Sequence, residues 1–210
     1  MLSGVDGAGK STQLALLDRY LRSRGLRTHR LWLRWFSALS YFLYFYARLA
    51  RRTVIVETRS RPVHVHVFWT DTALQRLYPR SLLLDLLLWF LVNKVIAWAR
   101  RVHVLLIDRG FLDACVDLLW ETRNVRFLRG TLARFIWKFS NDMNALILTV
   151  EPKEVAKRKS DIVSLKEIAF KKRCFEIFAK HLGIPVIDTT NKSVSDTFRE
   201  LMKLVKLSNS

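Results

Sequence analysis

Cysteine and acidic residues are both scarce in this 210-residue sequence. The two cysteines, Cys115 and Cys174, lie in apolar stretches with helical periodicity and form no pair at a spacing typical of metal sites. This pattern indicates buried thiols in a reducing compartment, so we expect a cytoplasmic protein. Aspartate and glutamate number 18 against 36 lysines and arginines, which gives a formal net charge of +18. A charge of this size favours polyanionic partners, namely nucleotides, nucleic acid or an anionic membrane surface.

Low-complexity linkers and internal repeats are also lacking. The basic residues are spread along the chain rather than gathered in a tail, which favours nucleotides over nucleic acid or a membrane surface as the partner. Half of the residues are hydrophobic, which excludes intrinsic disorder. The length suits one domain with a sizeable core, and we therefore expect a single domain over residues 1–210.

Glycine occurs only seven times, yet three of the seven fall in the stretch GVDGAGKSTQ, residues 4–13. This stretch matches the pattern G-x-x-x-x-G-K-[ST] of the phosphate-binding loop. Glycine permits backbone conformations that turn successive N–H groups inward, and the helix that follows adds the free amides of its N-terminus. We expect Lys10 to reach the β- and γ-phosphates of ATP and the Ser11 hydroxyl to bind Mg²⁺. The predicted ATP-binding residues of the stretch are Gly4, Val5, Asp6, Gly7, Ala8, Gly9, Lys10, Ser11 and Thr12.

The segment before this loop is short. A phosphate-binding loop normally follows a buried strand of about five or six residues, whereas only Met1, Leu2 and Ser3 precede Gly4. We expect the first strand to be truncated in this sequence, with several further apolar residues upstream of Met1 in the natural chain. Mass spectrometry of the natively expressed protein tests this expectation, and an N-terminus at Met1 would contradict it.

Strand-like and helix-like segments alternate along the rest of the chain. Apolar runs typical of buried strands end near residues 35, 108, 150 and 188, and amphipathic or apolar helical segments separate them. This alternation predicts an α/β fold, in which a parallel sheet is covered by helices on both faces. Two alternating segments around the turn SRP predict a hairpin inserted at residues 53–68.

The most apolar segment, residues 82–99, is long enough to raise the question of a membrane span. Asp85, Asn93 and Lys94 lie within it, and charges at membrane depth carry a high free-energy cost. We therefore expect this helix to be buried against the sheet and a subunit partner. The alternative is that it contacts a membrane surface together with the aromatic helix at residues 37–50.

Two residues at the end of a predicted strand complete the candidate site. Ligands of a parallel sheet bind at the carboxyl ends of its strands, and Asp108 and Arg109 end the apolar segment VHVLLIDRG. We expect Asp108 to position Mg²⁺ together with Ser11, and Arg109 to bind a second phosphate through its planar guanidinium. The alternative is that Asp108 caps the following helix and Arg109 lies at the surface.

Basic residues near two other strand ends are further candidates. Lys157, Arg158 and Lys159 follow the strand ALILTV, and a short lid around residues 153–164 would place them over the triphosphate, where they would neutralise charge during phosphoryl transfer. A solvated helix face is the alternative. Arg34 follows the second strand and is a candidate anion ligand, beside aromatic residues that either stack on a base or belong to the core.

Four stretches, GVDGAGKSTQ, IDRG before a helix, LTVEPKEVAKRK and VIDTTNKSVSD, together resemble the thymidylate kinase family. The resemblance covers most of the chain, with its motifs in order. It implies a P-loop kinase fold, usually dimeric, that transfers the γ-phosphate of ATP to a deoxynucleoside monophosphate. It also implies that Asp6 contacts the acceptor sugar, that Arg109 binds the acceptor phosphate and that Arg158 belongs to the lid. Asn191 matches a residue of the loop near the ATP base.

The sequence departs from that family at several places. Gly110 replaces the aromatic residue that usually follows the Asp-Arg pair, LRWF replaces the usual Arg-Glu-Pro after the second strand, the lid is short, and no arginine adjoins Asp85 to bind the acceptor base. We expect an ATP- and Mg²⁺-dependent kinase of a nucleoside monophosphate, with thymidylate as the acceptor and a homodimer as the assembly. The alternatives are a kinase of a nucleoside, a polynucleotide 5′ end or an amphiphilic molecule, and a nucleotide-binding protein without catalysis. The predicted catalytic residues are Lys10, Asp108, Arg109 and Arg158.

Overall fold

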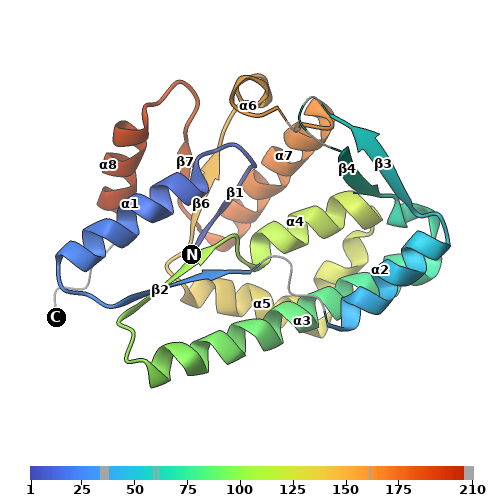
Figure 1. Ribbon diagram of the computed structural model, residues 1–210, viewed down its shortest axis with the longest axis horizontal. Helices are drawn as coiled ribbons and strands as arrows, with labels where there is room; N and C mark the ends of the chain where they lie inside the picture. The colour runs from blue at the N-terminus through green and yellow to red at the C-terminus, as the bar shows by residue number, and fades with distance from the viewer. Residues whose placement is uncertain (34–37, 59, 61, 161, 206–210) are drawn as a thin grey trace.

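The computed structural model describes residues 1–33, 38–58, 60, 62–160 and 162–205. Within these residues the main sheet has five strands, all parallel, in the order β2-β5-β1-β6-β7 (Figure 1). Its strands are β1 (Leu2–Gly4), β2 (Thr28–Trp32), β5 (Val104–Asp108), β6 (Leu146–Thr149) and β7 (Val186–Asp188). The prediction of an α/β fold built on a parallel sheet is confirmed.

The short strand β1 lies at the centre of this sheet. Leu2 pairs with Asp108 of β5 on one side and with Leu146 of β6 on the other. All three residues of β1 and all four of β6 are buried. Because the strands are parallel, the carboxyl ends of β1 and β5 meet at one edge of the sheet. This register brings Gly4 and Asp108 to the same edge.

Helices cover both faces of the sheet (Figure 1). They are α1 (Lys10–Ser23), α2 (Leu39–Leu49), α3 (Thr72–Ala99), α4 (Phe111–Thr122), α5 (Thr131–Asp142), α6 (Pro152–Arg158), α7 (Leu165–Leu182) and α8 (Val194–Leu204), with the 3₁₀ turns η1 (Phe68–Thr70) and η2 (Val125–Arg129). One face carries α1 and α8, which contact each other, and α1 packs on β1, β2 and β5. The opposite face carries α3, α4, α5 and α7, and α2 packs against α3. The short helix α6 follows β6 and contacts α7.

A two-stranded antiparallel hairpin lies in the segment where the sequence predicts an insertion. Its strands are β3 (Thr53–Glu57) and β4 (Pro62–His66). They form a sheet of their own and do not pair with the main sheet. The η1 turn then leads into α3, and the ring of the buried Phe68 packs edge-on against that of Tyr78, with 4.7 Å between the ring centroids. The hairpin therefore connects α2 to α3 without extending the sheet.

Helix α3 is longer than the sequence pattern predicted. It begins at Thr72, ten residues before the predicted start at residue 82. The cause is Asp71, whose carboxylate accepts hydrogen bonds from two N–H groups of the first turn and so caps the helix. The prediction was wrong here because it followed the continuous apolar run, whereas the first turns of α3, TALQRLYPRS, mix polar and apolar residues.

A proline lies inside the first half of α3. Pro79 has no N–H group, so the carbonyl of Gln75 lacks its helical hydrogen bond. The side chain of Asn124 donates to this carbonyl instead, at 3.1 Å. The helix therefore continues through the proline, with its freed backbone group satisfied from the segment that follows α4.

By length and composition α3 is the one helix of the described chain that could cross a membrane. Its most apolar window has a mean hydropathy of 1.8, and 33% of that window is buried in the structure. Mostly buried core helices of soluble proteins pass the same test. Within this chain α3 packs against α2, α4 and α5, but most of the window is not buried, so the expected burial is only partial. Asp85 is fully buried within it and accepts hydrogen bonds from the N–H groups of Leu39 and Ser40, at 3.0 and 2.8 Å. This carboxylate therefore caps the start of α2.

Candidate active site

The glycine-rich stretch forms a tight loop between β1 and α1. Gly4, Gly7 and Gly9 have φ angles of 137°, 85° and 85°, a region that side chains with a Cβ rarely adopt. The Nζ of Lys10 donates to the carbonyl oxygens of Gly4 and Val5, so the loop curls around the lysine ammonium, and the side chain is only 4% exposed. Among the described residues, no side chain caps the first turn of α1. The structure therefore gathers the predicted phosphate-binding residues around one buried cation and one free helix N-terminus.

Ser11 and Asp108 meet at the mouth of this loop. The Ser11 hydroxyl donates to Oδ2 of Asp108 at 2.8 Å, although 97 residues separate the two. Oδ1 of Asp108 is buried and has no hydrogen-bond partner among the residues that the structure describes. The Ser11 hydroxyl and the Asp108 carboxylate supply oxygen atoms of the kind that Mg²⁺ prefers as ligands. Protein sites for Mg²⁺ usually provide one or two carboxylates beside the substrate phosphates. The two residues fit the predicted metal.

Asp108 does not cap the next helix, which was the alternative interpretation. The N-cap of α4 is Gly110, and the carboxylate that accepts its N–H group is that of Asp113, at 3.1 Å. An ideal Cβ at Gly110 would lie 1.9 Å from Sδ of Met1, so a side chain at this position would require the flexible Met1 side chain to move.

Arg109 and Asp6 form a direct ion pair. Their Nη1 and Oδ1 atoms are 2.6 Å apart, and the same Asp6 oxygen lies 3.6 Å from Nζ of Lys10. Arg109 has a φ of 57°, a left-handed conformation that is uncommon outside glycine, and its N–H group donates to the carbonyl of Leu2. Strained backbone of this kind clusters at functional sites. Asp6 therefore lies between two cations, one on each side of the site.

Asp113 is a site residue that the sequence analysis missed. Its Oδ1 accepts from the N–H of Gly4 at 3.3 Å and its Oδ2 from the N–H of Gly110 at 3.1 Å. The same carboxylate lies 3.9 Å from Nζ of Lys10. Burial raises the pKa of Asp113 to about 6, against the opposing effect of the lysine charge. The available signal was an acidic residue at the third position of a helix that starts at a glycine, as in a capping box.

The burial of Asp113 predicts a pH-dependent stability. Its pKa is about 6 in the folded protein against an ordinary value of 3.8. Because the pKa is higher in the folded protein, protonated Asp113 stabilises the fold. This contribution to the unfolding free energy is fully present below about pH 4. It is lost as the pH rises through 6, which lowers the unfolding free energy by about 3 kcal/mol. Asparagine does not titrate, so only the wild type should lose this stability. We expect the difference in unfolding free energy, Asp113→Asn minus wild type, to increase by about 3 kcal/mol between pH 4 and pH 7.

Urea titrations at each pH measure this difference. A constant offset from the lost hydrogen bond does not matter, because only the trend with pH is compared. Asp196→Asn on α8, where the carboxylate is 54% exposed, is the control for the change of residue type. A flat curve for Asp113→Asn would show that Asp113 is not buried as a raised-pKa acid.

A small hollow opens between the loop, α4 and α7. Asp6 and Arg109 line it together with Asp117, Lys171 and Phe175. Nζ of Lys171 lies 2.6 Å from Asp117, and a second ion pair joins it to Glu167 at 2.7 Å. Burial opposes the lysine charge, but the two carboxylates outweigh it and raise the pKa of Lys171. The hollow thus combines one arginine facing Asp6 with an ion-paired lysine that holds α4 to α7.

Arg158 lies where the predicted lid residue should be, over the glycine-rich loop. Its guanidinium donates to the Gly7 carbonyl at 3.5 Å and to the Thr189 carbonyl at 3.1 Å. Lys157 instead is 75% exposed and pairs with Glu154 of its own helix, which fits the solvated alternative. Arg158 is therefore a member of the basic cluster that contacts the glycine-rich loop.

The remaining predicted residues have different outcomes. Asn191 lies in the turn after β7 with a φ of 54°, next to the segment that Arg158 contacts. Thr12 is exposed on the first turn of α1. Arg34 lies outside the described residues together with the neighbouring Trp35 and Phe36.

Comparisons with known proteins bear on the fold. No family model and no curated protein sequence matches the chain. Among solved structures, the chain is similar to the thymidylate kinase of Candida albicans, an enzyme of broad substrate specificity. The superposition has a TM-score of 0.58 and covers 97% of this chain and 88% of that one, at 16% sequence identity. At this identity the likeness concerns the fold, and the chain therefore has a thymidylate kinase-like P-loop kinase fold.

Proposed function

We propose that the protein is an ATP- and Mg²⁺-dependent kinase that phosphorylates a nucleoside monophosphate, with thymidylate as the acceptor. One observation carries the proposal. The Ser11 hydroxyl bonds to the Asp108 carboxylate at the mouth of a glycine-rich loop that surrounds Lys10. The likeness of the fold to a thymidylate kinase supports a nucleotide kinase in general. The acceptor rests on the resemblance of sequence motifs and on the position of Arg109 in the hollow beside the loop.

The donor side binds the triphosphate. The N–H groups of the loop and of the first turn of α1 point at the β- and γ-phosphates, and Lys10 exchanges the loop carbonyls for phosphate oxygens. Ser11 and Asp108 would hold Mg²⁺, which supplies charge neutralisation on the phosphates when bound. Arg158 adds a second cation above Gly7. Since phosphoryl transfer needs little covalent chemistry from the protein, these groups act by positioning and by electrostatic stabilisation.

The acceptor side lies at the hollow between the loop, α4 and α7. Arg109 would bind the acceptor phosphate with its planar guanidinium, and Asp6 would turn from Arg109 to the acceptor sugar. The charge of Lys171 is matched by two carboxylates, so Arg109 is the cation that faces the acceptor. A cation here favours an acceptor that carries a phosphate over a neutral nucleoside. A 5′-hydroxyl polynucleotide and an amphiphilic molecule remain the competing acceptors.

A screen of acceptors with ATP and Mg²⁺ tests the reaction. Thymidine monophosphate, other nucleoside monophosphates, nucleosides and 5′-hydroxyl oligonucleotides are each offered in excess, and ADP formation is measured. Selective turnover of thymidine monophosphate is the expected result. Turnover of nucleosides or oligonucleotides alone would contradict the acceptor, and tight ATP binding without turnover of any acceptor would contradict the kinase.

Replacing Arg109 with alanine separates the two sides of the site. We expect the KM for the acceptor to rise about 10- to 100-fold, as for the loss of a hydrogen bond to a charged group, while the KM for ATP changes by less than about threefold. Arg109→Lys should recover only part of the loss, because lysine lacks the bidentate fork. Arg199→Ala on α8 is the control, since that side chain is 72% exposed. Equal losses for both substrates would indicate a structural role.

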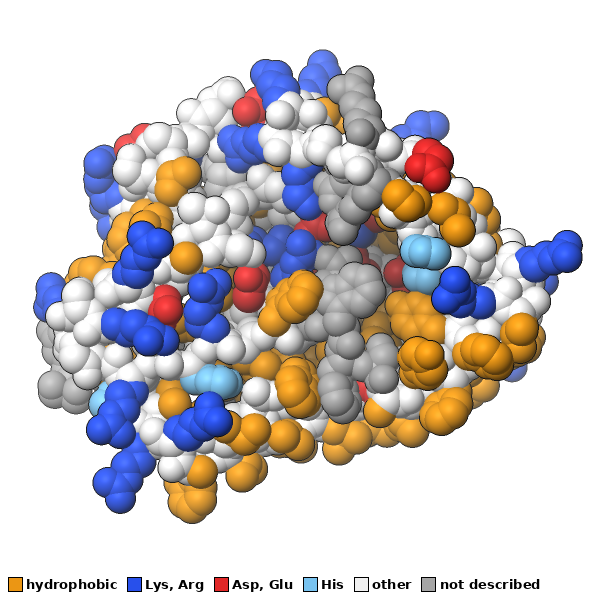
Figure 2. All heavy atoms as spheres, in the orientation of Figure 1, with side chains coloured by type: hydrophobic (Ala, Val, Ile, Leu, Met, Phe, Trp, Pro, Cys, Tyr) orange, Lys and Arg blue, Asp and Glu red, His pale blue; other side chains and the backbone are white. Residues whose placement is uncertain are grey.

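We also propose that the protein is a cytoplasmic homodimer that pairs through α3. Figure 2 shows hydrophobic side chains gathered along the lower edge of the molecule, over α2 and α3. On the second half of α3, four of the exposed apolar residues recur at alternating spacings of three and four, which is the seam pattern of two packed helices. Their exposed fractions run from 45% to 80%. These stripe residues are Leu88, Leu91, Val95 and Trp98.

Sedimentation velocity tests this assembly. We expect the wild type to sediment at about twice the chain mass of 24.7 kDa, and Val95→Asp to shift it to the monomer. Ile177→Asp is the control, because this residue is 52% exposed on α7, away from the stripe. A monomeric wild type that floats with anionic vesicles would favour the membrane alternative instead.

A further inference from the structure

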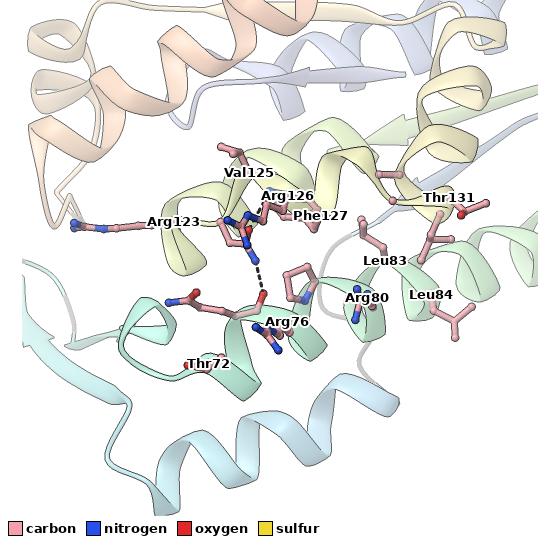
Figure 3. Close-up of a pocket in the computed structure, with 16 residues that line it drawn as sticks. Thr72, Arg76, Arg80, Leu83, Leu84, Arg123, Val125, Arg126, Phe127 and Thr131 are labelled. Atoms are coloured by element: carbon pink, nitrogen blue, oxygen red, sulfur yellow. Dashed lines mark hydrogen bonds between the residues drawn. The ribbon is translucent and has the colours of Figure 1, made fainter.

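A groove of about 1020 Å³ lies on the molecule outside the candidate active site. Its walls are the first turns of α3 on one side and the segment from the end of α4 through η2 to the start of α5 on the other (Figure 3). None of the residues that line it belongs to the phosphate-binding loop or to the hollow beside Arg109. We call it the arginine groove, after its lining residues Arg76, Arg80, Arg123 and Arg126.

The walls of the arginine groove are tied together. The hydrogen bond from Asn124 to the carbonyl of Gln75, which Pro79 leaves free, crosses from one wall to the other (Figure 3). Arg123 is held at the end of α4 with its guanidinium 4.2 Å from the centre of the Trp69 ring, a cation–π contact. A specific hydrogen bond therefore fixes the two walls of the groove relative to each other. The same bond satisfies the α3 carbonyl that Pro79 leaves without its helical partner.

The charge of the arginine groove is of one sign. Four of its sixteen lining residues are arginines, and none is aspartate or glutamate. Within the part of the chain that the structure describes, no carboxylate pairs with Arg76, Arg80 or Arg126. Concentrated positive charge without neutralising partners attracts polyanions. Arginine in particular matches phosphate, because its planar fork donates two parallel hydrogen bonds.

The spacing of the arginines and the apolar residues of the groove both indicate which kind of ligand fits it. Arg76 and Arg80 are four residues apart on α3, so their attachment points differ by one helical turn, about 6 Å along the axis. Two such cations suit a row of phosphates better than a single one. Leu83, Phe127 and Leu132 also line the groove, and apolar and aromatic surface accepts the faces of nucleobases. At about 1020 Å³ the groove is at the upper end of the range for ligand pockets, so it has room for several nucleotides.

We propose that the arginine groove binds single-stranded nucleic acid, with the phosphodiester backbone on the arginines and bases against the apolar floor. This binding is sequence-independent and separate from the kinase site. The large positive charge of the chain would then bind a polyanion at a defined site. The proposal does not rest on the kinase reaction, since no residue is shared between the two sites.

Fluorescence anisotropy with a labelled 12-nucleotide single-stranded DNA of mixed sequence tests the proposal on the full chain. We expect Arg76→Gln/Arg80→Gln to weaken binding at least tenfold. The slope of log K against log salt should fall by about 1.4, at about 0.7 for each lost contact to a single strand. Arg126→Gln alone should lower the slope by about half as much. Kinase activity of these variants should stay at the wild-type level.

A matched control carries the same change of charge on the other face of the sheet. Arg19→Gln/Arg24→Gln replaces two exposed arginines of the α1 segment, and we expect its affinity to change by less than about threefold. Equal weakening in both double variants would show general charge attraction and overturn the proposal. It would also be overturned if the wild type did not bind the DNA, if saturating ATP displaced the probe fully, or if inorganic triphosphate competed as well as unlabelled DNA of equal phosphate concentration.

Discussion

Replacing Lys10 with alanine is expected to lower the rate of ATP-dependent phosphoryl transfer about 10³-fold or more, in line with the loss of a key cation in other phosphoryl-transfer sites. The side chain is buried at the centre of the glycine-rich loop and is the cation nearest to its carbonyls. Alanine leaves the loop amides in place but removes the charge that neutralises the phosphates. Steady-state kinetics with ATP, Mg²⁺ and the active acceptor measure the effect on kcat.

Two controls define the meaning of that result. Lys203→Ala removes the same charge from an exposed position on α8 and should leave the rate within about twofold. The folding of Lys10→Ala is checked by urea titration, because Asp6 and Asp113 lose a nearby cation in this variant. A near-normal rate in a folded Lys10→Ala protein would contradict the proposed site.

Gly4→Ala is expected to destabilise the fold by more than about 4 kcal/mol, a loss that few single substitutions reach. An alanine Cβ would lie 1.9 Å from the Leu148 carbonyl oxygen, and the φ of 137° is itself unfavourable for any residue but glycine. The same carbonyl accepts the N–H of Val5 at 3.0 Å. Relief of the clash therefore breaks the pairing of β1 with β6 at the centre of the sheet. Since most domains are stable by only about 5–15 kcal/mol, we expect little folded protein.

Gly183→Ala separates the cost of the steric clash from the cost of the backbone conformation. This glycine ends α7 with a φ of 65°, and a Cβ there would meet no atom within 4 Å. The substitution thus carries only the cost of a left-handed backbone, about 1 kcal/mol. Urea titration of both variants gives the comparison. Similar small losses at the two positions would show that the central strand tolerates a side chain at residue 4.

The sheet could be predicted from the sequence because two of its strands, β5 and β6, are continuous apolar runs. LID at the end of β5 and LILT in β6 are buried, and such runs between helical segments are typical of parallel strands. The start of α3 could not be predicted, because its first turns mix polar and apolar residues and Pro79 is a residue that usually breaks a helix. The bond that offsets the proline comes from Asn124, 49 residues from Gln75. Local pattern carries no information about such a partner.

Some residues of the candidate site could likewise be predicted from the sequence and others could not. Lys10, Ser11, Asp108 and Arg109 sit in short motifs whose residue types and spacings are themselves informative, and the fold places the first three around the loop mouth. Asp113 and Lys171 sit in ordinary helical sequence. Their functional contacts span 109 and 54 residues, to Gly4 and Asp117. Only the packing of α4 beneath β1 and of α7 against α4 turns them into site residues.

One buried carboxylate joins two backbone segments that lie far apart in the sequence. Asp113 accepts hydrogen bonds from the amide of Gly4, at the start of the glycine-rich loop, and from the amide of Gly110, which adjoins Arg109. The loop and the Arg109 segment therefore share one anchor. Under the proposed function, a change at Asp113 should alter the KM for ATP and the KM for the acceptor together, although the carboxylate contacts neither substrate.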